Sequence, residues 1–168
     1  ERYAYSNSAY FLLAELVGRV TGMKTSEFAK QNIFEPLGMN NSHFHDDVNM
    51  ITKNRASGYS PLQDGGFRIN MTQIDMIGDG SIYTTIEDYL KWDQNYYNNK
   101  LGNGGQNLLD MVFTEGVLND GNNNGYGFGL RLADNRGLKT IGHGGSWAGF
   151  RANYIQYPEQ KFSIVILA

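Results

Sequence analysis

The chain has 168 residues, a length that fits one domain of ordinary size. Hydrophobic residues make up 40% of it and charged residues 18%, which is the composition of a folded globular protein rather than a disordered one. The net charge is -3 with the two signs interspersed, so charge gives no case for binding nucleic acid or an anionic membrane. The absence of cysteine excludes disulfides, thiolate zinc sites and cysteine nucleophiles.

Both ends of the chain are expected to be cuts through a larger fold. The sequence begins at Glu1 without Met, directly before a helix-like segment, and it ends inside the apolar run of residues 164–168. Domains usually end in exposed polar linkers instead. No apolar run is long enough to span a bilayer, and no basic-then-apolar targeting segment is visible at the start.

Two helices are predicted near the amino end. The first ends near Gly22, and it is indicated by apolar residues at helical spacing, namely Leu13, Leu16, Val17 and Val20. The second begins at Thr25 or Ser26 and is expected to reach Phe34. We expect it to end before Pro36, because the residue before a proline is biased away from helical backbone.

A long excursion is predicted over residues 40–80, which are rich in Asn, Asp, Gly and Ser and have little periodicity. Thr84 with Glu87 forms a capping-box pattern for a helix over residues 86–97. A short helix is predicted over residues 107–113.

The pattern changes to strands after Asn119. Small or polar residues alternate with Tyr126, Phe128, Leu130 and Leu132, which is the period of a half-buried strand. Further strands are predicted over residues 139–142, 150–157 and 162–168, with a turn at 158–161 between the last two. Helices followed by consecutive strands favour an α+β fold with an antiparallel sheet. We therefore predict a single incomplete domain over residues 1–168, mainly helix and loop over about 1–118 and antiparallel strands over about 119–168.

Two short segments have residue types suited to chemistry, and each also has a structural explanation. Tyr5, Ser6 and Asn7 lie directly before the first helix, where Ser or Asn serves as a cap. The run from His143 to Ser146 places a histidine, which titrates near neutral pH, beside two glycines that allow a backbone or ligand to approach closely. The same run also fits a glycine-rich hairpin turn with a surface histidine.

Four landmarks occur in a fixed order along the chain. They are Tyr-Ser-Asn at 5–7, Glu-Pro-Leu-Gly-Met at 35–39, the Gly-Asp-Gly-Ser segment that opens residues 78–89, and His-Gly-Gly at 143–145 followed by Gly149 and Phe150. In order and chemistry they resemble the penicillin-binding-protein/class C β-lactamase-like serine hydrolase family. The resemblance covers nearly the whole chain. It implies a partial β-lactamase/D,D-peptidase-like fold, a helical region followed by antiparallel strands of the central sheet.

The resemblance also implies roles for individual residues. Tyr5 would transfer the proton in acylation and deacylation, although a phenolate needs nearby positive charge to lower its pKa from about 10. Asn7 would hold the catalytic lysine and contact the substrate amide. His143 would supply a hydrogen-bond donor or positive charge facing the tyrosine and the anionic group of the substrate.

The remaining implied roles concern the glycine-rich strand. Gly144 and Gly145 would let the substrate lie against the strand edge, as in strand addition. The backbone N–H of Ser146 would be one of two oxyanion-hole donors, and the nucleophile would supply the other.

The chain departs from the family pattern at its first motif, Ser-x-x-Lys. The sequence contains no such motif, and the nearest match begins with Thr21 instead of Ser. We expect the nucleophilic serine to lie upstream of Glu1 and this chain alone to be catalytically inactive. His143 replaces the lysine common in true β-lactamases, which makes antibiotic hydrolysis a less favoured main activity.

The predicted function of the complete protein is serine acyl transfer to water on an amide or ester. The substrate would be a D-Ala-type peptide, a β-lactam or a small ester, with no metal or organic cofactor and no nucleic acid partner. The resemblance implies an extracytoplasmic location, periplasmic or secreted. One alternative is a non-catalytic module of the same fold that binds peptidoglycan or peptides. Another is an interaction unit that pairs through exposed sheet edges.

Three further patterns are weaker. Gly144-x-Ser146-x-Ala148 approaches a nucleophile elbow, but a strand and not a helix is predicted after it. His43 and His45 beside two aspartates have metal-ligand types, and a polar loop explains them better. Residues 120–125 match the first half of a calcium loop, but Arg131 stands where a bidentate Glu is required.

Overall fold

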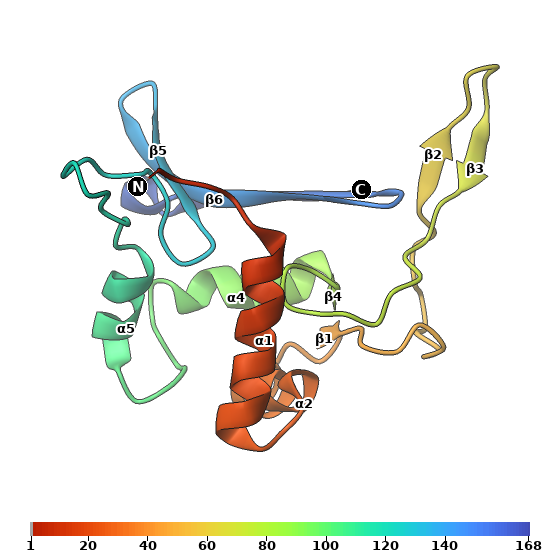
Figure 1. Ribbon diagram of the computed structural model, residues 1–168, viewed down its shortest axis with the longest axis horizontal. Helices are drawn as coiled ribbons and strands as arrows, with labels where there is room; N and C mark the ends of the chain where they lie inside the picture. Colours follow the sequence, from red (N-terminus) through yellow and green to blue (C-terminus); the bar gives the residue numbers. More distant parts are fainter. Residues whose placement is uncertain (1) are drawn as a thin grey trace.

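The computed structural model describes residues 2–168. Helices come first along the chain and an antiparallel sheet comes last, which confirms the α+β prediction (Figure 1). The helical elements are α1 (Asn7–Thr21), α2 (Thr25–Ala29), the π-helix η1 (Lys30–Phe34), α3 (Glu35–Leu37), α4 (Ile86–Asn95), α5 (Gly105–Val112) and the 3-10 helix η2 (Pro158–Gln160). The strands are β1 (His43–Phe44), β2 (Tyr59–Pro61), β3 (Phe67–Ile69), β4 (Ile82–Tyr83), β5 (Arg131–Asn135), β6 (Leu138–Trp147), β7 (Phe150–Tyr157) and β8 (Phe162–Leu167).

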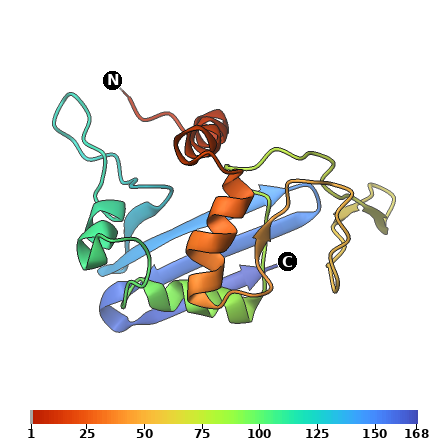
Figure 2. The same cartoon turned by 90° about the horizontal axis from the view of Figure 1, so that it is seen from below.

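The main sheet has four antiparallel strands in the order β5-β6-β7-β8. Figure 1 shows this sheet close to edge-on, with α4 beside one face, and Figure 2 shows it turned by 90°. The predicted hairpin between β7 and β8 is confirmed, and it turns through η2 and Lys161, which has a φ of 51°. The turn between β6 and β7 is tight and passes through Ala148 with a φ of 49°.

One edge of β6 is only partly covered. β5 pairs with β6 from Leu138 to Gly142, where Gly142 faces Arg131. From His143 to Trp147 the strand pairs with β7 alone. The strand predicted over residues 139–142 thus continues through the glycine-rich run, so the hairpin-turn explanation of that run is wrong. Among the described residues, this stretch of β6 has a strand neighbour on one side only.

The strand expected from Tyr126 is wrong before Arg131. Tyr126 makes only an isolated bridge to Arg131, and the intervening residues form a bend. Gly125 and Gly129 have φ values of 68° and 75°, which non-glycine residues in strands do not adopt. The alternation of apolar residues in this segment was therefore real, but the glycines between them turn the backbone.

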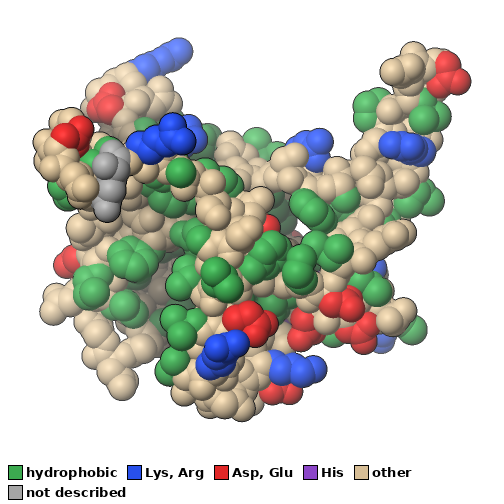
Figure 3. Space-filling model, viewed as in Figure 1, with side chains coloured by type: hydrophobic (Ala, Val, Ile, Leu, Met, Phe, Trp, Pro, Cys, Tyr) green, Lys and Arg blue, Asp and Glu red, His purple; other side chains and the backbone are tan. Residues whose placement is uncertain are grey.

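α1 has the predicted signals at both ends. The Ser6 hydroxyl accepts a hydrogen bond from the Ala9 N–H at 3.3 Å, and Gly22 ends the helix with a φ of 70°. The helix packs through small groups, because a Cβ added to Gly78 would lie 2.9 Å from the Ala14 Cβ. Its long apolar side chains are exposed, namely Leu12, Leu13, Leu16 and Val20. Figure 3 shows hydrophobic side chains gathered on this side of the molecule.

The second predicted helix does not end before Pro36. It begins at Thr25, widens into η1 and continues through α3 to Leu37. Pro36 falls in the first turn of α3, where a missing N–H and a fixed φ are tolerated. Gly38, with a φ of 71°, ends the segment.

The predicted helix over residues 86–97 is confirmed as α4, but its cap is Thr85 and not Thr84. The Thr85 hydroxyl accepts from the Asp88 N–H at 3.2 Å, whereas the Thr84 hydroxyl lies 2.7 Å from that of Ser42. Asp88 is fully buried and accepts hydrogen bonds from the Asn41 N–H and the Ser42 hydroxyl. Burial alone would raise the pKa of Asp88, but bonds from Lys91, Asn41 and Ser42 hold it below its usual range.

The excursion over residues 40–80 contains the paired strands β2 and β3, which project from the body as an arm (Figure 1). The β6–β7 turn packs against the base of this arm. The Gly149 N–H donates to the Asn70 carbonyl at 2.9 Å, and a Cβ added to Gly149 would lie 2.4 Å from the Gly58 carbonyl carbon. Glycine is therefore required at this contact.

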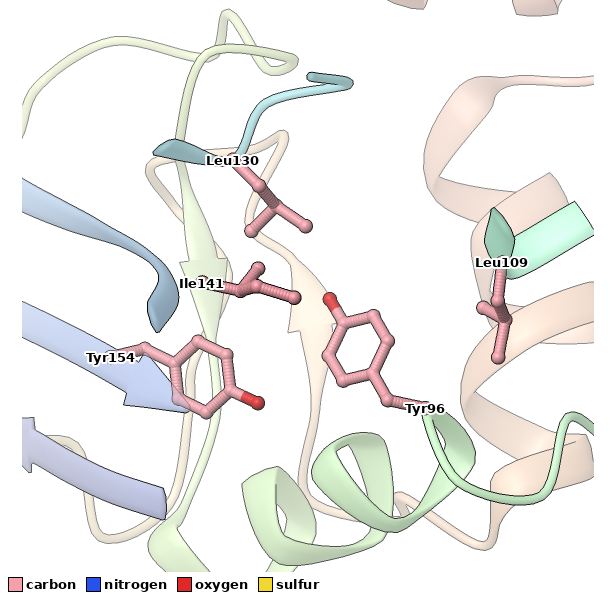
Figure 4. Close-up of a cluster of buried hydrophobic side chains, with 5 residues drawn as sticks. All are labelled: Tyr96, Leu109, Leu130, Ile141 and Tyr154. Carbon is pink, nitrogen blue, oxygen red and sulfur yellow. The ribbon is translucent and has the colours of Figure 1, made fainter. Parts of the chain in front are cut away.

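The core between α4, α5 and the sheet is built from five buried side chains (Figure 4). They are Tyr96, Leu109, Leu130, Ile141 and Tyr154. Ile141 and Tyr154 come from β6 and β7 on the sheet face that also bears His143, because side chains two residues apart share a face. The core thus fixes the distance between β6 and the helices α4 and α5.

A buried carboxylate joins α4 to the sheet. Asp93 Oδ1 accepts hydrogen bonds from the hydroxyls of Tyr154 at 2.7 Å and Ser163 at 2.6 Å, and from the Gln156 amide at 3.2 Å. Burial, together with the neighbouring Asp93, raises the pKa of Tyr154 far above its usual range, so its hydroxyl remains a donor. Three donors from β7 and β8 therefore converge on one helix side chain.

Within residues 2–168, no helix has both the length and the apolar character needed to cross a membrane.

We predict that Asp93→Ala lowers the free energy of unfolding by about 3 kcal/mol, because two buried donors and one partly buried donor lose their acceptor. Asp110→Ala, which removes an exposed aspartate of α5, should change it by less than about 0.5 kcal/mol. Urea unfolding followed by circular dichroism measures both. Equal stability of the two variants would contradict the proposed importance of this carboxylate.

Candidate active site

Tyr5 and His143 lie on the same cavity although 138 positions separate them in the chain. Their ring centroids are 5.9 Å apart and the rings are stacked with an angle of 23° between their planes. Tyr5 comes from the extended segment before α1, and His143 comes from the middle of β6. The cavity has a volume of about 730 Å³ and is also lined by Tyr3, Tyr126 and Gly144.

The ring of His143 has a defined orientation. Its Nδ1 lies 2.7 Å from the Gly144 carbonyl oxygen. A carbonyl oxygen only accepts, so Nδ1 carries the proton and donates. The Nε2 atom of the ring is thereby left for a bond to another group.

Tyr126 is a member of the site that the sequence analysis did not identify. Its ring lies edge-on to His143 at 5.9 Å and to Tyr5 at 6.4 Å, and it also packs on Tyr3 at 5.4 Å. Burial, with the neighbouring phenol of Tyr10, raises the pKa of Tyr126 far above its usual range. The raised pKa favours the neutral phenol of Tyr126. No local sequence signal distinguishes it from the other apolar residues of its segment.

The backbone groups that face the uncovered edge of β6 follow from the bonding of β7. Arg151 exchanges both backbone hydrogen bonds with Ala168, at 2.7 and 2.8 Å, so alternate residues of β7 counted from Arg151 bond to the β8 side. The residues between them bond to β6, and their partners there are His143, Gly145 and Trp147. Gly144 and Ser146 therefore direct their N–H and C=O groups toward the open edge.

The structure brings only some of the predicted site residues to the cavity wall. Tyr5, His143 and Gly144 line it, whereas Asn7, Gly145 and Ser146 do not. Asn7 is the exposed first residue of α1, and Ser6, not Asn7, caps that helix. Gly145 and Ser146 follow directly along the open edge. The catalytic role of each of these residues stays a prediction.

The described residues that line the cavity include no serine. They do include the hydroxyl-bearing Thr140 and the positively charged Arg131. The cavity therefore presents a phenol, an imidazole and a cation, but the serine of the family pattern is not among its lining residues.

His43 and His45 form a separate pair, in which His45 is buried and His43 is half-buried. Their rings meet through His43 Nε2 and His45 Nδ1 at 3.2 Å, and His45 stacks on Tyr83 at 4.2 Å. Nowhere in residues 2–168 do three His, Cys, Asp or Glu side chains gather as a metal site would require. Burial and the neighbouring His45 lower the pKa of His43. Burial and the Arg55 guanidinium lower the pKa of His45, against a smaller raising effect of nearby aspartates.

Comparison with known proteins finds relatives along the whole length of the chain. The family model described as Beta-lactamase matches residues 1–168. The D-aminopeptidase of Brucella ovis is 25% identical to this chain over 165 residues, which are 98% of this chain and 31% of the relative. The chain thus spans about a third of the length of the curated relatives that it matches.

Two solved structures extend the comparison. The octameric penicillin-binding protein homologue from Pyrococcus abyssi superposes with a TM-score of 0.86 at 26% identity, over 99% of this chain and 38% of that chain. The penicillin-binding protein from Bacillus halodurans superposes with a TM-score of 0.84 at 25% identity, over 100% of this chain and 52% of that chain.

Two glycines of β6 provide a matched test of the strand next to the cavity. A Cβ added to Gly142 would lie 2.1 Å from the Tyr154 carbonyl oxygen, whereas a Cβ on Gly144 meets nothing closer than 3.6 Å. We predict that Gly142→Ala lowers the free energy of unfolding by about 1–3 kcal/mol, the usual cost of overpacking. Gly144→Ala should cost less than about 1 kcal/mol. Thermal unfolding compares the two, and equal losses would show that the strand pairing is incorrect.

Acid should weaken the fold through the pair of His43 and His45. Both pKa values are lowered in the folded state. Near and below the ordinary histidine pKa of about 6.5, the unfolded chain therefore binds more protons than the folded chain. The free energy of unfolding should therefore fall as the pH is lowered from 7 to 5.5, by at most about 1.4 kcal/mol per pH unit for each ring. His43→Gln should flatten this dependence, and His143→Gln serves as the control. Urea unfolding at each pH measures the slope, and an unchanged slope in His43→Gln would contradict the assignment.

Proposed function

Because the chain belongs to the Beta-lactamase family, we propose that the full-length protein is a serine hydrolase that cleaves an amide or ester through an acyl-enzyme. The observation that carries this proposal is the stacking of Tyr5 on His143 at 5.9 Å, on one cavity beside the open edge of β6. Two polar rings from opposite ends of the chain share this cavity, and neither is needed there for the core. Their juxtaposition supports a role in proton transfer.

The proposed reaction uses Tyr5 as the general base and acid. The serine Oγ attacks the carbonyl carbon while its proton passes to the Tyr5 phenolate. The tetrahedral intermediate collapses, the bond to the leaving group breaks, and Tyr5 returns the proton to the leaving amine or alkoxide. Water then attacks the acyl-enzyme by the same route and regenerates the serine.

His143 supports this cycle electrostatically. With Nδ1 donating to Gly144, its Nε2 side is left for the shared cavity and the Tyr5 ring. With Nδ1 donating to Gly144, Nε2 can act as a donor only in the imidazolium form of the ring, and in that form its positive charge would favour the ionised phenol. It would also attract an anionic group on the substrate, together with Arg131 on the same cavity wall.

The open edge of β6 supports the placement of the substrate carbonyl. The Ser146 N–H faces that edge in the pairing pattern of the sheet. If the oxyanion is held there, removal of this donor would raise the activation free energy by about 2.7–4 kcal/mol. Asn7, at the start of α1 and close to Tyr5 in sequence, is proposed to hold the catalytic lysine.

The serine and lysine are proposed to lie upstream of Glu1. The 168 residues contain no Ser-x-x-Lys motif, and the chain covers 31% of the D-aminopeptidase that it matches. The name of that relative favours an amide of an amino acid as the substrate class, with D-Ala-type peptides, β-lactams and small esters as the candidates to compare. An extracytoplasmic location belongs to the same proposal.

The mechanism predicts that Tyr5→Phe in the full-length protein lowers kcat/KM for amide or ester substrates by about 10²–10⁴-fold, the usual contribution of general acid–base catalysis. Tyr59→Phe is the matched control, because the two tyrosines are similarly exposed, at 55% and 53%. Turnover and labelling by a fluorophosphonate measure the effect. Unaltered turnover in Tyr5→Phe, or no serine adduct in the wild type, would rule the mechanism out.

The absence of Ser-x-x-Lys from these residues favours one second candidate, a binding module of the same fold. It would use the open edge and the cavity to hold a peptidoglycan or peptide ligand without cleaving it. Sequencing of the full-length protein separates the two: a Ser-x-x-Lys upstream of Glu1 supports the enzyme. Saturable binding of a D-Ala-D-Ala peptide without turnover supports the module.

A further inference from the structure

On the side of β6 where β5 pairs with Leu138–Gly142, residues 143–147 have no strand neighbour among the described residues. β5 runs antiparallel to β6 and begins at Arg131, which faces Gly142. A substrate that lies along residues 143–147 on this side would extend the line of β5 beyond Arg131. In this antiparallel direction its carboxyl end points toward the cavity and its amino end points toward Trp147.

The register then assigns each part of the substrate to a position on β6. If the substrate carbonyl bonds to the Ser146 N–H, the same substrate residue also gives its N–H to the Ser146 carbonyl, as in a hydrogen-bonded antiparallel pair. The leaving group then lies opposite Gly145, toward His143 and the cavity. Whatever is attached to the amino side of the acyl residue lies opposite Trp147.

Trp147 is held in place although it is on the surface. Its side chain is 54% exposed, and its indole N–H donates to the Thr72 hydroxyl at 3.0 Å. The adjoining turn is fixed as well, since the Gly149 N–H bonds to the Asn70 carbonyl at 2.9 Å. An exposed aromatic ring that is fixed in this way loses little conformational entropy when a ligand packs on it.

On the His143 side of the sheet, one pair of residues without long side chains lies between two pairs that carry aromatic rings. Gly145 faces Ala152 across the strands, and neither has a long side chain. On one side of this pair His143 faces Tyr154, and on the other Trp147 faces Phe150. His143 and Trp147 are four residues apart, which is about 13 Å along a strand. Gly145 and Ala152 are both exposed, so Trp147 is the next large side chain on this face on the side away from His143.

We propose that Trp147 determines specificity for the amino side of the substrate by forming the wall of a subsite for an apolar acyl or peptidyl group. Such a group packs against the fixed indole, while a free amino group gains nothing from it. The inference rests on the proposed function, because it takes the Ser146 N–H as the site of the carbonyl. Thr72 is a positioning residue in this account, since it acts only through the indole.

The test compares D-alanine p-nitroanilide, with a free amino group, and its N-phenylacetyl derivative on the full-length protein. We expect Trp147→Ala to lower kcat/KM for the N-phenylacetyl substrate by about tenfold or more, and for the free amine by less than twofold, since apolar contacts discriminate in this range. Trp147→Phe should retain most of the preference. Phe162→Ala is the matched control, because this aromatic residue is also 54% exposed and lies at the far end of the sheet.

Thr72→Val provides a second and milder test. It should raise KM for the N-phenylacetyl substrate about threefold without changing kcat, and it should leave both constants for the free amine unchanged. If Trp147→Ala does not fold, this variant decides, and an unchanged KM would overturn the inference. Equal losses on both substrates in Trp147→Ala, or a larger loss on the free amine, would overturn it as well.

Failure of the proposed function gives a different result. In that case the wild type hydrolyses neither substrate, and the subsite is tested by binding instead. N-phenylacetyl-D-alanine should then quench tryptophan fluorescence in the wild type and not in Trp147→Phe. Equal fluorescence changes in the two proteins would refute the subsite independently of any activity.

Discussion

The Asp93 carboxylate is the constraint on which the arrangement of this molecule depends. It accepts hydrogen bonds from hydroxyl and amide donors of β7 and β8. These bonds fix the position of the sheet relative to α4. Tyr154, one of these donors, faces His143 directly across the strands. A buried carboxylate without its donors is costly, and buried donors without an acceptor also cost free energy. The position of the imidazole therefore depends on an interaction outside the cavity.

A second constraint is the position at which β5 begins. Its first residue, Arg131, pairs with Gly142 of β6, and the glycines at 125 and 129 turn the preceding chain away. The next residues of β6 have no strand neighbour on that side among the described residues, which in most proteins is a liability that side chains or loops cover. Here the edge lies between the aromatic group around His143 and the fixed ring of Trp147. An edge with defined walls at both ends is suited to an extended ligand of limited length.

Local signals predicted the elements well where one residue controls the backbone. Ser6 and Gly22 bound α1 because a cap side chain and a left-handed glycine act within a single turn. The predictions failed where competing partners were distant in sequence. Thr84 lost the capping role to Thr85 because Ser42 offered it another bond, and Pro36 stayed inside a helix because the preceding turn widened. Tyr126 was placed in a strand because alternation alone does not reveal the glycine backbone angles between its apolar residues.

The amino-acid sequence by itself determined the α+β class, the order of helices and strands, and the family resemblance, because each rests on residue types and their order along the chain. It also singled out Tyr5 and His143 as chemical groups. Only the tertiary structure decided that their rings share one cavity, that Tyr126 joins them, and that Ser146 faces an open edge. These facts depend on the register of strands and on contacts between residues more than a hundred positions apart, and no local preference specifies such contacts.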